Sequence, residues 1–179
     1  MNKKKSPGQV AAIVFVIWVL VKKIAAQVSQ KIHGEYSIFV DCSKSLDEMV
    51  ALGHYCTVDE DVTVESFPVD EKIKADVSMR LFYFHKGMPT DRVCILDDGV
   101  KVQMDKEGWK PASIWHLLFF GAKYPKLQKK FTIIALGSSC MGKVPFLGWG
   151  GIEGDRRYLR LINSGYGWYS YCRFLAVRK

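Results

Sequence analysis

Apolar residues form an unbroken run near the start of the chain, where residues 10–21 read VAAIVFVIWVLV. Lysines lie on both sides of this run, and Lys22 and Lys23 follow it directly. Extended through Ala26 the stretch has 17 residues, the lower limit for a helix that crosses the hydrocarbon layer of a bilayer. We therefore predict a membrane-anchoring helix over residues 8–26, inside a basic segment and linker that together span residues 1–34.

Two other interpretations of this segment stay open, a cleaved secretory signal and a helix docked on a soluble body. Cleavage after Ala26 would place Ile24 at position −3, where signal peptides need a small residue. An uncleaved single-pass anchor fits better. Lysines on both flanks determine the orientation only weakly, and the charge of the free amino terminus favours a soluble domain on the outer side of the membrane.

Shorter apolar patterns after residue 34 predict alternating strands and helices. Residues 36–40 read YSIFV, typical of a strand, and Ser45 with Glu48 forms a capping box that opens a helix before Gly53. Residues 57–68 hold four acids and predict an extended acidic loop. Residues 78–85, SMRLFYFH, predict a second strand.

Residues 92–96, RVCIL, predict a further strand that ends at a turn formed by Asp97-Asp98-Gly99. The alternative is a helix over residues 93–104, interrupted at Gly99. Ser113 then opens a helix, SIWHLLFFGAKYP, which Pro125 ends.

Short β-type runs separated by Gly and Ser fill the rest of the chain, at residues 131–139, 144–151, 158–163 and 171–177. Alternation in the last run places Phe174 and Ala176 on one side and Arg173, Leu175 and Val177 on the other. A buried central strand tolerates this mixture better than an edge strand does. Together these elements predict one α+β domain over residues 35–179, with short helices and a mainly antiparallel, loop-rich C-terminal sheet.

Charge divides the chain into three blocks. Residues 1–34 carry six lysines and no acid, residues 35–110 carry nine basic and 16 acidic side chains, and residues 111–179 carry eleven and two. The ordinary apolar content excludes disorder. No zinc finger, RRM signature or basic zipper accompanies the basic blocks, so the charge alone does not indicate a nucleic-acid binder.

Two resemblances follow from short motifs. The sequence at residues 108–113, GWKPAS, and the closing RFLAVR at 173–178 resemble the turn and last strand of bacterial C-type-lectin-like and formylglycine-generating-type domains. The chain departs from that pattern at Lys110 and lacks a cluster of calcium-binding carboxylates, so neither calcium binding nor catalysis is carried over. Residues 46–55, 108–113, 124–138 and 173–178 together resemble a family of small uncharacterised bacterial proteins, which implies a shared fold and no particular function.

Candidate catalytic and metal-binding residues are few. The five cysteines, Cys42, Cys56, Cys94, Cys140 and Cys172, show no CxxC spacing, so a zinc ribbon is excluded and the disulfide pattern is left open. His54 and Cys56 could form a dyad only with an orienting group that the sequence does not reveal. Residues 137–143 end in Gly-Lys but lack the Ser or Thr of a phosphate-binding loop. We expect no cofactor and no metal.

Aromatic and arginine side chains interleave near the C-terminus, and this region is our candidate ligand surface. Aromatic faces and guanidinium groups together can bind a glycan, a peptide or a polyanion. The sequence thus favours a non-enzymatic binding module tethered to a membrane; the alternatives are a hydrolase or transferase using Cys56 or Cys140, and a soluble protein that binds nucleic acid or another polyanion. The candidate residues are Arg156, Arg157, Arg160, Tyr166, Trp168 and Tyr169.

Overall fold

The computed structural model describes residues 34–69, 73–84, 93–150 and 156–179. The predicted anchor over residues 8–26 lies outside the described residues, as do His85 and Arg92 at the ends of two predicted strands. Residues 37–179 form one compact unit. No helix within the described ranges is long and apolar enough to span a bilayer.

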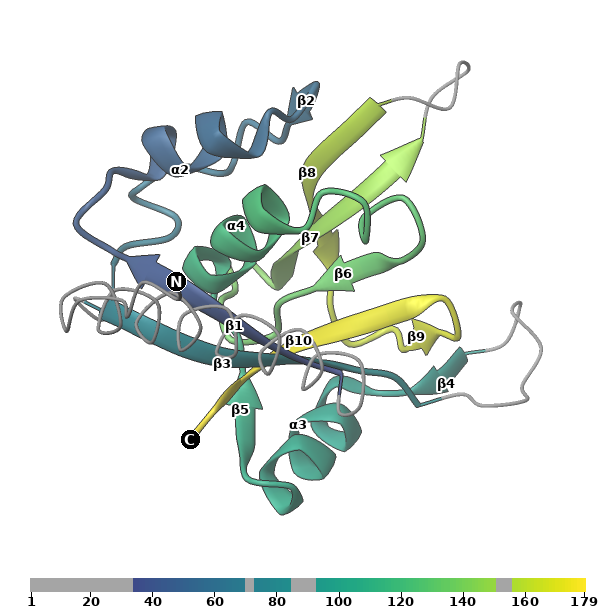
Figure 1. Cartoon of the computed structure of the whole chain (residues 1–179). Coiled ribbons are helices and arrows are strands. Elements are labelled where there is room, and N and C mark those ends of the chain that lie inside the picture. The colour runs from purple at the N-terminus through teal and green to yellow at the C-terminus, as the bar shows by residue number, and fades with distance from the viewer. Residues whose placement is uncertain (1–33, 70–72, 85–92, 151–155) are drawn as a thin grey trace, which may run out of the picture. The chain divides into compact units, whose positions relative to one another are not determined.

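These residues form an α+β domain with a mixed, mostly antiparallel eight-stranded sheet and a separate two-stranded ribbon (Figure 1). Its helices are α2 (Leu46–Gly53), α3 (Asp97–Lys106) and α4 (Ile114–Lys123). Its strands are β1 (Glu35–Asp41), β2 (Thr57–Val58), β3 (Lys74–Phe82), β4 (Val93–Ile95), β5 (Trp109–Pro111), β6 (Thr132–Ile134), β7 (Lys143–Gly150), β8 (Arg156–Asn163), β9 (Trp168–Tyr169) and β10 (Cys172–Arg178). The predicted α+β class, with short helices and a mainly antiparallel sheet, is thereby confirmed.

β10 lies at the centre of the sheet, whose strand order is β1-β3-β10-β6-β7-β8-β2. Phe174 pairs with Phe82 of β3 along one edge and with Ile134 of β6 along the other. Toward the C-terminal end of β10, β5 replaces β6 as the strand paired with this second edge. The prediction of a central last strand is confirmed, because every residue from Cys172 to Val177 except Arg173 is buried.

Each face of β10 contributes to a separate layer of the core. Phe174 and Ala176 belong to a buried cluster with Val100 and Met104 of α3. Leu175 is fully buried on the opposite face. Figure 1 shows α4 and α3 on opposite sides of the central strands, and α2 lies beside α4. The alternation predicted from the sequence thus separates two packed layers.

Helices α2 and α4 begin where the sequence predicted. The Ser45 side chain accepts a hydrogen bond from the Glu48 amide while the Glu48 carboxylate accepts one from the Ser45 amide, so the capping box is confirmed. Ser113 caps α4. Gly53 is the last residue of α2 rather than the residue after it, and His54 adopts the left-handed conformation that ends the helix.

The predicted turn at Asp97-Asp98-Gly99 is wrong, because these residues form the first turn of α3. Carboxylates in the first turn of a helix interact favourably with its unpaired amide groups. The predicted strand before it is confirmed as β4, and the alternative helix starts four residues later than expected.

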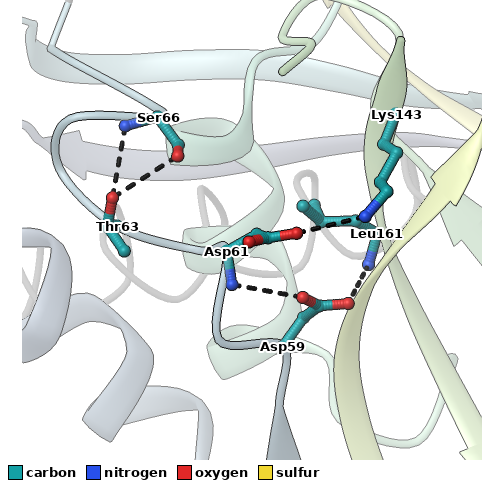
Figure 2. A network of polar contacts seen from close by, with 6 residues as sticks. All are labelled: Asp59, Asp61, Thr63, Ser66, Lys143 and Leu161. Atoms are coloured by element: carbon teal, nitrogen blue, oxygen red, sulfur yellow. Dashed lines mark hydrogen bonds and ion pairs between the residues drawn. The ribbon is translucent and has the colours of Figure 1, made fainter. Parts of the chain in front are cut away.

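The acidic stretch after α2 is also more ordered than the predicted extended loop. It begins with the short strand β2 and continues as a series of turns that contacts the β7–β8 hairpin (Figure 2). Asp59 Oδ2 accepts a hydrogen bond from the Leu161 amide at 3.3 Å, and Asp61 Oδ2 lies 3.1 Å from Lys143 Nζ. This ion pair raises the pKa of Lys143. Two of the acids therefore attach this segment to the sheet.

Candidate functional site

Alternation along β8 separates the candidate arginines into two groups. Arg157 points toward the helices, where its Nη2 donates to the Gly121 carbonyl at 2.8 Å and its Nη1 donates to the Gly53 carbonyl. Its Nε donates to Gln128 Oε1 at 3.1 Å. Gly53 belongs to α2, Gly121 to α4, and Gln128 to the loop after α4. The Arg157 side chain therefore connects these three segments to the sheet, and all of its nitrogen atoms are engaged in these contacts.

Arg156 and Arg160 lie on the other face of β8 and are exposed. The Arg160 guanidinium lies 5.1 Å from the centre of the Tyr158 ring. Arg156 pairs with Gly150 at the far end of the β7–β8 hairpin. The candidate arginines are thus not gathered around one point.

Trp168 is buried, with 3% of its surface exposed. Its indole Nε1 donates a hydrogen bond to Asp97 Oδ1 at 2.5 Å, and its ring meets Phe174 edge-on at 5.7 Å. Pairing of β9 with β4 holds the tryptophan under the sheet face that α3 covers. Trp168 therefore belongs to the core rather than to an open surface.

The tyrosines around Trp168 are exposed and surround a hollow of about 470 Å³, which we call the tyrosine hollow. Tyr166 is 81% exposed at its rim. Tyr169 and Tyr171 stack in parallel with ring centres 5.7 Å apart. Six aromatic residues from three strands and two loops line the hollow: Phe146, Tyr158, Tyr166, Trp168, Tyr169 and Tyr171.

Among the residues that the structure describes, no side chain that lines the tyrosine hollow carries a charge; the remaining lining residues are Thr132, Ile162, Asn163, Gly167 and Cys172. Partial burial raises the pKa of Tyr171, with smaller contributions from Cys172 and Tyr169. The Tyr171 hydroxyl therefore stays protonated at neutral pH and can both donate and accept hydrogen bonds. The hollow offers flat apolar faces with a few neutral polar groups.

Of the six candidate residues, Tyr166, Trp168 and Tyr169 come together at this hollow, and the three arginines do not line it. Sequence analysis missed Phe146 and Thr132, which reach the hollow from β7 and β6. Tyr158 was recognised as part of the aromatic stretch. Phe146 gave no signal, because an apolar residue within an apolar strand is equally suited to the core.

A second, smaller cavity of about 190 Å³ lies at the start of α4 and is lined in part by Cys42, Lys110 and His116. His116 Nδ1 lies 2.8 Å from Ser113 Oγ and accepts from the Ser113 amide at 3.3 Å. These contacts form the capping box of α4. The pair therefore has a local structural role, which the Ser-x-x-His spacing could have indicated.

The other predicted candidates are placed as follows. Cys56 is exposed, and its amide donates to the Arg157 carbonyl. Cys140 and Lys143 form the ends of a tight turn, so the glycine-lysine sequence there belongs to a turn. Cys42, Cys56, Cys140 and Cys172 form no disulfide with one another. Among residues that the structure describes, no cluster of three or more metal-ligating side chains occurs.

Comparisons with protein-family models, with curated proteins and with solved structures find no match to this chain. The site must therefore be interpreted from its own geometry.

Proposed function

We propose that this chain is a non-enzymatic binding module, tethered to a membrane by residues 8–26, that holds a neutral sugar ring in the tyrosine hollow. The observation that carries the proposal is the hollow itself, about 470 Å³ in volume, whose described lining contains six aromatic residues and no charged one. This volume lies in the range of small-molecule sites, which are mostly apolar with a few placed polar groups.

The uncharged lining favours a neutral glycan over a polyanion. A sugar ring presents an apolar face that packs on an aromatic ring and hydroxyl groups that need hydrogen-bond partners. Tyr169 and Tyr171 offer two parallel rings, and Asn163 and Thr132 add neutral donors and acceptors. Polyanions need arginine or lysine in contact, and Arg156, Arg157 and Arg160 all lie outside the lining.

Binding without catalysis is favoured by the same set of residues. The part of the lining that the structure describes contains no Asp, Glu, His, Lys or Arg that could transfer a proton near neutral pH. Cys172 is buried beneath the tyrosines. The tether is proposed from the apolar, lysine-flanked run at the start of the chain.

A glycan array with neutral and sulfated oligosaccharides, probed with the full chain, tests this function. We expect binding to one class of neutral oligosaccharide that changes little with salt. Tyr169→Ala should weaken it about fivefold to tenfold, because a stacking partner is lost. Tyr83→Ala is the matched control, since Tyr83 is exposed but does not line the hollow.

Two outcomes would overturn the proposal. Binding only to sulfated oligosaccharides, with a steep loss at high salt, would assign the ligand surface to the arginines instead. Absence of binding to every neutral oligosaccharide by the folded chain would exclude a glycan.

A further inference from the structure

Lysines that do not line the tyrosine hollow are concentrated at the end of α4 and in the loop that follows it. The described part of residues 111–179 contains eleven basic residues and no acid, because Glu153 and Asp155 lie outside it. Two of these cations pair with acids of the earlier block, Lys143 with Asp61 and Lys179 with Asp105. Most of the positive charge of this half is therefore not neutralised within the described part of the fold.

Four lysines occur within eight residues at the end of α4 and in the loop after it. We call Lys123, Lys126, Lys129 and Lys130, together with Tyr124 and Trp149, the basic loop patch. All four lysines are exposed. Lys126 and Lys130 have no carboxylate within ion-pair distance among the described residues.

The loop is fixed on the sheet, so these charges have defined positions. Gln128 is buried in the middle of the loop, and its Nε2 donates to the Gly148 carbonyl at 2.6 Å and to the Tyr158 carbonyl at 2.9 Å. Lys129 Nζ lies 4.0 Å from the centre of the Trp149 ring. The buried glutamine therefore fixes the loop on the sheet, while Lys126 and Lys130 on either side of it stay exposed.

Partly exposed aromatic rings lie directly beside the lysines. Tyr124, Pro125 and Leu127 line a shallow hollow of about 310 Å³ with Lys123 and Lys126. Lysines attract anionic headgroups, and tryptophan and tyrosine favour the boundary between headgroups and acyl chains. This combination fits the surface of an anionic bilayer.

We infer that the basic loop patch docks the domain on anionic phospholipid headgroups. The inference rests on the membrane tether of the proposed function and adds a second, peripheral contact to it. A single-stranded nucleic acid is less well suited, because bases need open aromatic faces. Here Lys129 lies over the Trp149 ring, and Tyr124 packs against Phe120 with ring centres 5.3 Å apart.

Residue-resolved lysine labelling tests the docking. The full chain is reconstituted into phosphatidylcholine vesicles with or without about 30% phosphatidylserine and treated with a membrane-impermeant amine reagent. Mass spectrometry then gives the labelling of Lys126 and Lys130 relative to Lys101, an exposed lysine of α3 in the same molecule. We expect this ratio to fall about fivefold or more on phosphatidylserine and to recover near 1 M salt, where charges are screened beyond about 3 Å.

The double variant Lys126→Gln/Lys130→Gln should restore the labelling of Lys123 on phosphatidylserine vesicles. Lys44→Gln/Lys106→Gln, which removes the same charge outside the patch and keeps Lys101 as the reference, should leave Lys123 protected. An unchanged ratio on both lipids overturns the inference. So does protection of Lys126 and Lys130 by single-stranded RNA in detergent solution but not by phosphatidylserine.

A separate assay tests the membrane anchor proposed for residues 8–26. It measures whether the chain still floats with neutral vesicles after an alkaline wash. Flotation without a lipid-dependent labelling ratio supports the tether and rejects the docking. Salt-sensitive binding to phosphatidylserine without flotation on neutral vesicles rejects the tether and supports the patch as an independent lipid contact.

Discussion

Tyr55 lies beneath the Arg157 guanidinium, in a notch between Gly53 and Gly121. The guanidinium carbon is 5.0 Å from the ring centre. A Cβ at Gly121 would lie 2.3 Å from the Tyr55 hydroxyl oxygen, so only glycine leaves room for the ring. The hydroxyl is buried and has no hydrogen-bond partner among the described residues. Its burial raises the pKa of Tyr55 far above the ordinary value, although the charge of Arg157 opposes this shift.

Tyr55→Phe should therefore stabilise the domain. It keeps the ring under Arg157 and removes a buried, unpaired hydroxyl whose desolvation costs about 1 kcal/mol or more. We expect the midpoint of thermal unfolding, followed by near-ultraviolet circular dichroism, to rise by about 2–4 °C.

Tyr158→Phe is the matched control for this change. The Tyr158 hydroxyl donates to the Trp149 carbonyl at 3.3 Å, so its removal should leave the midpoint unchanged or lower it. A lower midpoint for Tyr55→Phe would contradict the prediction and indicate a partner for the hydroxyl.

Single residues of the candidate site show what local sequence can indicate. Tyr166 and Tyr169 were expected at an open surface because glycines surround them, and both are exposed there. Trp168 stands between them in the same pattern and yet is buried, because Asp97, distant in sequence, accepts its indole N–H. A polar partner supplied by another element cannot be read from the neighbours of a residue.

At the level of elements, the turn before β7 has an unusual residue at its tip. Cys140 and Lys143 exchange two backbone hydrogen bonds of 2.9 Å. Met141 and Gly142 between them both have positive φ, 49° and 73°. Such turns favour Asn-Gly, and methionine pays a steric cost in the left-handed region. Met141 is 88% exposed, so its side chain gains little from packing.

Met141→Asn should stabilise this turn by about 0.5–1 kcal/mol, because asparagine tolerates the left-handed conformation. Gly142→Ala should destabilise it by about 1 kcal/mol, since alanine is strained at the same φ. Denaturant unfolding of both variants beside the parent chain measures the difference. Equal midpoints for all three proteins would show that the turn does not limit stability.

The sequence predicted the elements that have a recognisable pattern of their own, such as helices α2 and α4. It did not predict the short strands β5 and β9, which depend on pairing with residues distant in sequence. Helices α2 and α4 have capping serines and apolar faces of helical period. β5 and β9 are three and two residues long, and they are strands only because β10 and β4 pair with them. Their sequences hold too few positions for alternation to be recognised.

For the whole molecule, β10 joins the two parts of the sheet. β1 and β3 lie on one side of it, and β6, β7, β8 and β2 lie on the other. Phe174, Leu175 and Ala176 are each fully buried. Removing this strand would both separate the two parts and expose two faces of the core.

Deletion of residues 172–179 should therefore abolish the folded state. Burial of each large side chain contributes about 1.5–3 kcal/mol, so the loss of Phe174, Leu175 and Val177 together is comparable to the 5–15 kcal/mol stability of a typical domain, before the lost backbone pairing is counted. We expect no cooperative thermal transition and rapid proteolysis. Deletion of Lys179 alone removes a surface ion pair with Asp105 and one backbone hydrogen bond to the Gly108 carbonyl, and it should leave the transition in place. A cooperative transition in the larger deletion would contradict this assignment of β10.

The central position of β10 also determines the order of events during biosynthesis. From Phe82 to its partner Phe174 the ribosome must add 92 residues, which takes about 5–20 s at typical elongation rates. Until then the edge of β3 that pairs with β10 has unpaired backbone groups. A newly made chain therefore depends on chaperones or on the β1–β3 pair alone to avoid aggregation until its last strand is translated.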